Sequence, residues 1–118
     1  ENGWIIINTH LSFVPFFNYR QLVQIKRWSK NLGSNKNKII LMGDMNIPFS
    51  KVVAGLKWNS LASGKTFPSW GPKVEIDYML SQTLRPNFVK QIPYTHAGMS
   101  DHLPLQLDFP LEPFEVLI

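Results

Sequence analysis

The sequence predicts an α/β protein with a mixed β-sheet and helices on one face of that sheet. Two observations carry this prediction. Short apolar runs over 4–10 and 38–43 each end on polar residues, as buried strands do at the edge of a sheet. Between them, the segment 18–33 places apolar residues at helical spacing. A strand, a helix and a strand in this order predict two parallel strands joined by a right-handed crossover.

The crossover unit also carries start and stop signals. Asn18 is the expected N-cap of the helix, and Gly33 is expected to end it. Because parallel strands end at the same edge of a sheet, Thr9–His10 and Asp44–Asn46 are predicted to lie together there. The apolar stripe of the predicted helix consists of Leu22, Ile25, Trp28 and Leu32.

The second half of the chain predicts further strands that leave this edge. Asp77 lies near the start of one strand, and Asp101 and His102 lie just before the start of the last. His10 and Asp44 lie instead at the ends of the first two strands, so all five side chains are predicted to collect along one edge. The expected elements are a short helix at 50–56, a loop at 62–73, strands at 75–80, 87–92 and 103–109, and a returning loop at 93–100.

Composition narrows the classes of function. At 118 residues and 44% hydrophobic content, the chain has the size of one domain with a modest core. It has no cysteine, which excludes disulfides, thiolate metal ligands and a catalytic thiol. The formal net charge of +4 suits a polyanionic partner such as nucleic acid and suits ordinary solubility equally well. No stretch is long and apolar enough to span a bilayer.

The polar side chains at the predicted edge suit one kind of chemistry. Oxygen donors outnumber imidazoles among them, which favours Mg²⁺ or Mn²⁺ over Zn²⁺. An aspartate beside a histidine holds one tautomer of the ring and raises its pKa, so that the ring acts near neutral pH. These features outline the hydrolysis of a phosphate ester. The candidates are His10, Asp44, Asn46, Asp77, Asp101 and His102.

Each candidate also has a plainer interpretation. A lone histidine is more often structural than catalytic, and we interpret His96 in that way. For His10 and His102, the neighbouring acids at strand ends favour a function. Asp77 lies within an apolar strand, where an unpaired carboxylate is costly to bury, so we expect it to have a partner.

Four motifs, taken in order, resemble the later motifs of the endonuclease/exonuclease/phosphatase superfamily, which has the fold of deoxyribonuclease I. They are "NTHLS" (8–12), "LMGDMN" (41–46), "EIDYML" (75–80) and "SDHLPLQLDF" (100–109). The resemblance implies that 1–118 is the C-terminal half of a four-layer α/β/β/α sandwich whose N-terminal half is absent. It also implies metal-dependent hydrolysis of phosphodiesters or phosphomonoesters by an activated water, with Mg²⁺ or Mn²⁺.

The resemblance further implies catalytic roles for five residues. Asp44 would orient or deprotonate the attacking water, and Asn46 would bind a phosphate oxygen or help to position the metal. His102 would donate to the scissile phosphate, with Asp77 as its carboxylate partner. His10 would contact the phosphate from the other side. Such preorganised donors and charges are what phosphate-ester hydrolysis needs.

The implied metal ligands are Asp101, Asp44 and Asn46, and here the sequence departs from the family. A glutamate that binds the principal metal, an asparagine near the start of the fold and the partner acid of the first histidine belong to the N-terminal half, and they have no counterpart in this sequence. Phe67 matches the aromatic pocket of the abasic-site endonucleases. Val74 stands where those enzymes carry tryptophan, which weakens the abasic-site interpretation.

The apolar strands imply a partner. In "WIIIN" and "KIILM", apolar side chains follow one another and so face both sides of the sheet, while the predicted helices cover only one side. We expect the other side to be covered by the N-terminal half, as a separate fragment, or by a second copy in a sheet-to-sheet homodimer.

Two classes of function stay open. The first is a metal-dependent phosphoesterase, with weak or no activity from this stretch alone. The second is a catalytically silent fragment, or a binding or assembly domain, that retains the fold. The sequence does not distinguish DNA, RNA, phospholipid, inositol phosphate or nucleotide as the substrate.

Overall fold

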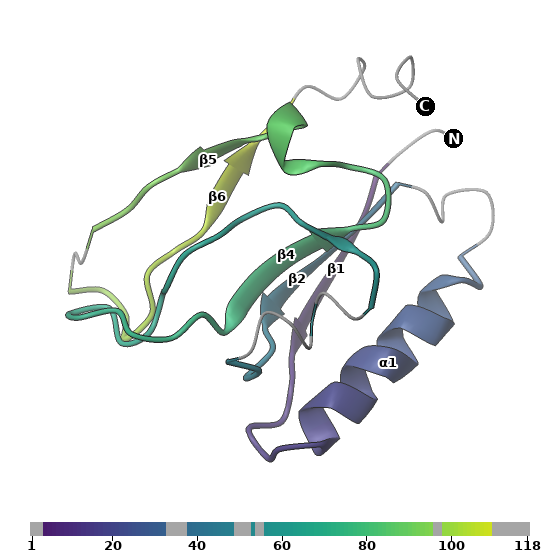
Figure 1. Ribbon diagram of the computed structural model, residues 1–118, viewed down its shortest axis with the longest axis horizontal. Helices are drawn as coiled ribbons and strands as arrows, with labels where there is room; N and C mark the ends of the chain where they lie inside the picture. The colour runs from purple at the N-terminus through teal and green to yellow at the C-terminus, as the bar shows by residue number, and fades with distance from the viewer. Residues whose placement is uncertain (1–3, 33–37, 49–52, 54–55, 96–97, 110–118) are drawn as a thin grey trace.

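The computed structural model shows an α/β fold with a mixed sheet, as predicted, and it describes residues 4–32, 38–48, 53, 56–95 and 98–109 (Figure 1). The elements in order are β1 (Ile5–His10), α1 (Phe17–Ser29), β2 (Ile39–Asp44), β3 (Asn59–Ser60), β4 (Asp77–Ser81), a 3₁₀ helix (Pro86–Phe88), β5 (Lys90–Ile92) and β6 (Gln106–Asp108).

The main sheet has four strands in the order β1-β2-β4-β3. β1 and β2 are parallel, as the crossover predicts, and β4 is antiparallel to both β2 and β3. The register places His10 opposite Asp44, and Asp44 opposite Asp77. The last residues of β1 and β2 and the first residue of β4 therefore meet at one edge, which confirms this part of the prediction.

Helix α1 packs against one face of the sheet. Leu22 is fully buried in a core that includes Ile39 and Leu41 of β2, and the half-buried Ile25 and Leu32 pack against the same core. Trp28 was predicted to belong to this apolar stripe, but 52% of it is exposed. The three other stripe residues already cover the inner face, so Trp28 lies outside it.

The N-cap of the helix lies two residues earlier than predicted. Phe16 occupies the N-cap position, and no side chain caps the helix there. Asn18 is buried within the first turn: its Oδ1 accepts from the Tyr19 backbone N–H at 2.7 Å, and its Nδ2 donates to the Asn46 carbonyl at 3.0 Å. Asn18 therefore joins the helix to the loop that follows β2, instead of capping the helix.

The opposite face of the main sheet carries a second core. Ile40 and Met79 are buried there, and Leu105 and Leu107, from the segment that contains β6, pack against them. β5 and β6 form a separate two-stranded antiparallel sheet. The chain thus covers part of this face itself, which corrects the expectation that a partner must cover all of it.

The separate β5–β6 sheet also corrects the expectation of a single mixed sheet. β4 has no free edge for the last strand, because β2 pairs with one side of it and β3 with the other. The sequence did not predict β3, which is only two residues long. The expected strands at 75–80, 87–92 and 103–109 are shorter in the structure, where a 3₁₀ helix with a proline in its first turn precedes β5.

Several predictions fall partly or wholly outside the described residues. These are most of the short helix at 50–56, part of the loop at 93–100, and His96. Gly33, the predicted helix stop, also lies outside the described residues, but the prediction is wrong because α1 already ends at Ser29 with Lys30 as its C-cap. Within the described part of the chain, α1 is too short and too polar to cross a membrane, and no other helix there could do so.

Candidate functional site

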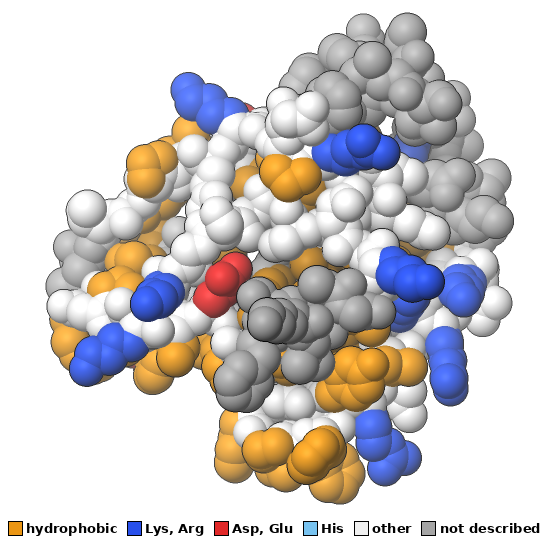
Figure 2. All heavy atoms as spheres, in the orientation of Figure 1, with side chains coloured by type: hydrophobic (Ala, Val, Ile, Leu, Met, Phe, Trp, Pro, Cys, Tyr) orange, Lys and Arg blue, Asp and Glu red, His pale blue; other side chains and the backbone are white. Residues whose placement is uncertain are grey.

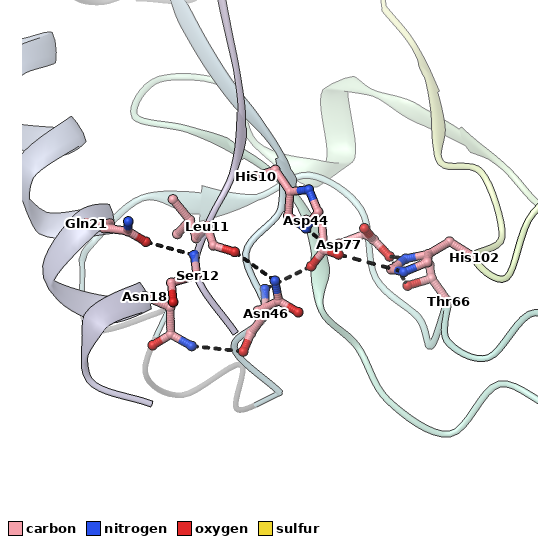
Figure 3. A network of polar contacts seen from close by, with 10 residues as sticks. All are labelled: His10, Leu11, Ser12, Asn18, Gln21, Asp44, Asn46, Thr66, Asp77 and His102. Carbon is pink, nitrogen blue, oxygen red and sulfur yellow. Dashed lines mark hydrogen bonds and ion pairs between the residues drawn. The ribbon is translucent and has the colours of Figure 1, made fainter. Parts of the chain in front are cut away.

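The polar side chains gather where β1, β2 and β4 meet (Figure 3). Asp44 is the last residue of β2, Asp77 is the first of β4 and His10 is the last of β1. His102 comes from the segment between β5 and β6. One ligand atom from each of Asp44, Asp77 and His102 lies within 4.8 Å of the other two. The structure thus brings together four of the predicted site residues.

Asp77 has the partner that its position required. Its Oδ2 lies 2.7 Å from Nδ1 of His102, and the Thr66 hydroxyl donates to the same oxygen. Because a carboxylate only accepts hydrogen bonds, this contact makes Nδ1 of His102 the protonated nitrogen. The other ring nitrogen, Nε2, is then directed to Asp44, whose Oδ2 lies 3.7 Å away. The Phe67 ring packs on the imidazole, with 5.0 Å between ring centroids.

The surroundings of His102 favour its charged form. Burial lowers the pKa of His102, but the hydrogen bond with Asp77 and the charges of Asp77, Asp44 and Asp101 outweigh this effect. The pKa of His102 is therefore raised above the ordinary value of 6.5. Protonated His102 stabilises the fold fully below that ordinary value, and this contribution is lost as the pH rises through the folded-state pKa.

Replacing the partner acid tests this assignment. Asp77→Asn is expected to lower the pKa of His102, because it removes the negative charge that favours the charged ring and replaces a charged hydrogen-bond acceptor with a weaker neutral one. The pKa is measured by NMR titration of the ring in a metal-free buffer. Asp101→Asn, which removes a charge with no hydrogen bond to the ring, is the control and should lower the pKa by less. An equal shift in both variants would contradict the Asp77–His102 pair.

Asp44 lies between the two histidines. Its Oδ2 is 3.4 Å from Nε2 of His10 and 3.7 Å from Nε2 of His102. Its Oδ1 accepts from the backbone N–H of Asn46 at 2.9 Å, which fixes the orientation of the carboxylate. Asp44 thus presents one oxygen toward both imidazoles while the other holds the following loop. The His10 side chain is 75% exposed and forms the outer boundary of the group.

Asn46 joins the ends of three elements. Its Nδ2 donates to the Leu11 carbonyl at 2.8 Å, and its own carbonyl accepts from Asn18. Its backbone has φ 51°, a left-handed conformation that asparagine tolerates better than most residues. Because the amide nitrogen is engaged, the atom that Asn46 can offer to a ligand is Oδ1, an oxygen acceptor suited to a cation.

Asp101 lies near the site but outside the cluster. Its side chain is exposed, and it is not among the three described residues whose ligand atoms lie together. Its backbone carbonyl accepts from the Ser69 N–H at 2.7 Å, which ties the loop that precedes His102 to the loop around Ser69. The structure therefore places Asp101 as a nearby charge.

Two residues that support the site, Thr66 and Tyr78, could not be identified from the sequence. Thr66 was part of a predicted loop, and it reaches Asp77 because 66–67 and 74 pair in an isolated bridge beside the start of β4. Tyr78 donates its hydroxyl hydrogen to the Ile47 carbonyl at 2.7 Å, which anchors the loop after Asp44. Burial, followed by the charges of Glu75 and Asp77, raises the pKa of Tyr78, so this donor stays protonated.

Comparison with known proteins identifies no relative of this chain. No family model, no curated protein and no solved structure matches this chain. The function of the site therefore has to be argued from its residues and their geometry.

Proposed function

We propose that this chain is a metal-dependent phosphoesterase, the function that the motif resemblance implies. One observation carries the proposal: Asp44 lies within 3.7 Å of two imidazole nitrogens, and a second acid, Asp77, holds one of those imidazoles at 2.7 Å. An acid that can bind a cation or activate water thus lies beside a ring that can carry a positive charge. Phosphate-ester hydrolysis uses both groups.

His102 has the role of phosphate donor in this proposal. Asp77 holds the proton on Nδ1, so Nε2 is the atom that donates to a phosphoryl oxygen when the ring is charged. The raised pKa of His102 increases the charged fraction of the ring near neutral pH. His10, mostly exposed on the other side of Asp44, contacts the phosphate from that side.

The donor set fits a hard divalent cation. Mg²⁺ or Mn²⁺ keeps several waters and needs few protein ligands, chiefly carboxylate oxygens. Asp44 Oδ2 and Asn46 Oδ1 would hold it, with Asp101 as a nearby acid, because Asp77 Oδ2 already accepts two hydrogen bonds. When bound, the ion would lower the pKa of a water ligand and offset negative charge on the phosphate. Asp44 would orient that water.

The four-layer sandwich and its partner belong to this proposal. The β5–β6 sheet covers part of the second face of the main sheet, but Ile6 of β1 is 53% exposed on that face. An N-terminal half, or a second copy of the chain, would bury Ile6 and supply the metal ligands that the family places in that half. We therefore expect slow turnover from this chain alone.

Hydrolysis of bis-p-nitrophenyl phosphate tests the proposal. The chain is expected to release p-nitrophenolate with Mg²⁺ or Mn²⁺ faster than the metal alone does, and EDTA is expected to abolish the release. Calorimetry with Mg²⁺ and Mn²⁺ is the matching measurement of binding. A folded chain that neither binds the metals nor hydrolyses the ester would overturn the proposal in favour of the catalytically silent fragment.

A further inference from the structure

Exposed apolar side chains gather on the two sides of the candidate site. Ten large hydrophobic side chains are exposed in the described part of the chain, and eight of them come from segments that border the site. We call the first group the β1–α1 rim: Phe13, Val14, Phe16, Phe17 and Tyr19. We call the second group the His102 rim: Trp70, Tyr94 and Met99. Ile6 and Trp28 belong to neither group, although Trp28 lines a pocket together with His10.

The β1–α1 rim directly follows the strand that ends at His10. Figure 2 shows apolar side chains gathered at the lower end of the molecule, where Figure 1 places this loop and the start of α1. Phe13 is 81% exposed and Phe16 is 82% exposed, so neither contributes much to the core. Exposed apolar side chains that gather in this way mark protein or membrane contacts.

Phe16 is unfavourable for folding in two ways. Its φ of 70° is left-handed, a conformation that an aromatic residue rarely adopts and that costs on the order of 1 kcal/mol or more. It also occupies the N-cap of α1 without a side-chain hydrogen bond, where Asn, Asp or Ser would stabilise the helix by about 1 kcal/mol. Because folding does not explain an exposed phenylalanine here, an intermolecular contact is the better explanation.

Two residues of the His102 rim, Tyr94 and Met99, line a mainly apolar cavity of about 260 Å³. Leu103 and Pro104 also line it, and so does His102. A hydrogen bond joins two of the segments that line the cavity: the Ser69 hydroxyl donates to the Ser100 carbonyl at 2.6 Å. The proposed phosphate donor therefore borders a space suited to an apolar part of a substrate.

Basic side chains accompany both rims. Arg20 is exposed and follows Tyr19 in α1, while Lys65 and Lys73 are exposed on the loop that carries Trp70. The combination of exposed aromatic side chains with lysine and arginine is typical of surfaces that enter the interface of an anionic bilayer. Single-stranded nucleic acid also stacks on aromatic rings, but aliphatic Val14 and Met99 and the apolar cavity favour lipid.

We propose that the two rims form a docking face for an anionic phospholipid surface, and that the phosphate ester brought to Asp44 and His102 is a phospholipid headgroup. The docking itself needs only the exposed side chains. The choice of substrate rests on the proposed function, because it requires a working phosphoesterase site between the rims.

Vesicle sedimentation tests the docking face. The chain is expected to bind vesicles of phosphatidylcholine mixed with phosphatidylserine, and to bind phosphatidylcholine alone more weakly. The double variant Phe13→Ser/Phe17→Ser is expected to weaken binding at least about tenfold, since two exposed rings no longer enter the interface. Ile6→Ser removes an exposed apolar side chain that belongs to neither rim and does not line the pocket at His10, so it is the control, with little effect expected on vesicle binding.

Phe16→Asn separates docking from folding. Asparagine tolerates left-handed backbone and caps helices, so this variant is expected to raise the melting temperature while weakening vesicle binding. Failure of the folded wild-type chain to bind either vesicle would overturn the docking face, as would equal losses in Ile6→Ser and Phe13→Ser/Phe17→Ser. Loss of self-association in the rim variants, seen by light scattering without any vesicle binding, would assign the face to a second copy and also overturn it.

Hydrolysis distinguishes the two proposals. Vesicle binding with no turnover of phospholipid or bis-p-nitrophenyl phosphate would leave the docking face standing and overturn the phosphoesterase. Turnover of bis-p-nitrophenyl phosphate with no vesicle binding would support the phosphoesterase and overturn the docking face. Asp44→Asn is expected to bind vesicles at least as well as the wild-type chain, because it removes a negative charge.

Discussion

Asp44→Asn is expected to reduce metal-dependent hydrolysis of bis-p-nitrophenyl phosphate by about a thousandfold, to the background rate of the metal alone. Asparagine has the shape of aspartate, and its oxygen can still accept from the Asn46 N–H. It has no charge to hold a cation and no oxygen that can take a proton from water. The rate should therefore fall while the melting temperature changes little.

Asp108→Asn is the matched control for this substitution. Asp108 is an exposed acid at the end of β6, opposite Lys90 in the register of the β5–β6 sheet, and its Oδ1 accepts from Gln106 Nε2 at 3.2 Å. Its replacement should leave the rate unchanged. Turnover in Asp44→Asn equal to that of the control would mean that Asp44 neither binds the metal nor activates water, and the proposed mechanism would have to be abandoned.

Gly43→Ala is expected to cause the largest loss of stability, more than about 4 kcal/mol in the free energy of unfolding. Gly43 has φ 136°, which only glycine adopts readily, and an added Cβ would overlap the Thr9 carbonyl oxygen. It would also lie 2.9 Å from the Thr9 carbonyl carbon. Both atoms belong to the backbone of β1, so no side-chain rotation can relieve the overlap, and the strands that position His10 and Asp44 would have to separate.

Two other glycines divide this effect into its parts. At Gly64, φ is 128° but nothing lies within 4 Å of an added Cβ, so Gly64→Ala should cost only the backbone strain, on the order of 1–3 kcal/mol. At Gly71 neither problem arises, and Gly71→Ala should change stability by less than about 0.5 kcal/mol. Urea unfolding of the three variants measures the series. A Gly43→Ala loss no larger than that of Gly64→Ala would show that the strands tolerate the added atom.

The parts of the fold that were predictable are those with local signals. The apolar runs of β1 and β2 and the helical stripe of α1 are local patterns of neighbouring residues, and the parallel pairing of β1 with β2 follows from their order. The predicted N-cap was wrong because the side chain of Asn18, the best capping residue, instead donates a hydrogen bond to the Asn46 carbonyl. Local preference was overridden by a contact between residues 28 positions apart.

The pairing of β6 could not be predicted for a different reason. Its own sequence indicates a strand but not a neighbour, since any free sheet edge can accept one. The choice depended on β3, a two-residue strand that takes the remaining edge of β4. So short a strand has too few residues to show a period in the sequence, and its presence is decided by packing.

The sequence by itself determined the crossover unit, the polar residues at the ends of its strands and the need of Asp77 for a partner, because strand periodicity and the cost of burying a charge are local properties. The tertiary structure alone decided that Thr66 and His102 share one oxygen of Asp77, that Asn46 is held by the ends of β1 and α1, and that the exposed aromatic residues border the site. These arrangements depend on distances between residues far apart in the chain, which are set only when the elements pack against one another.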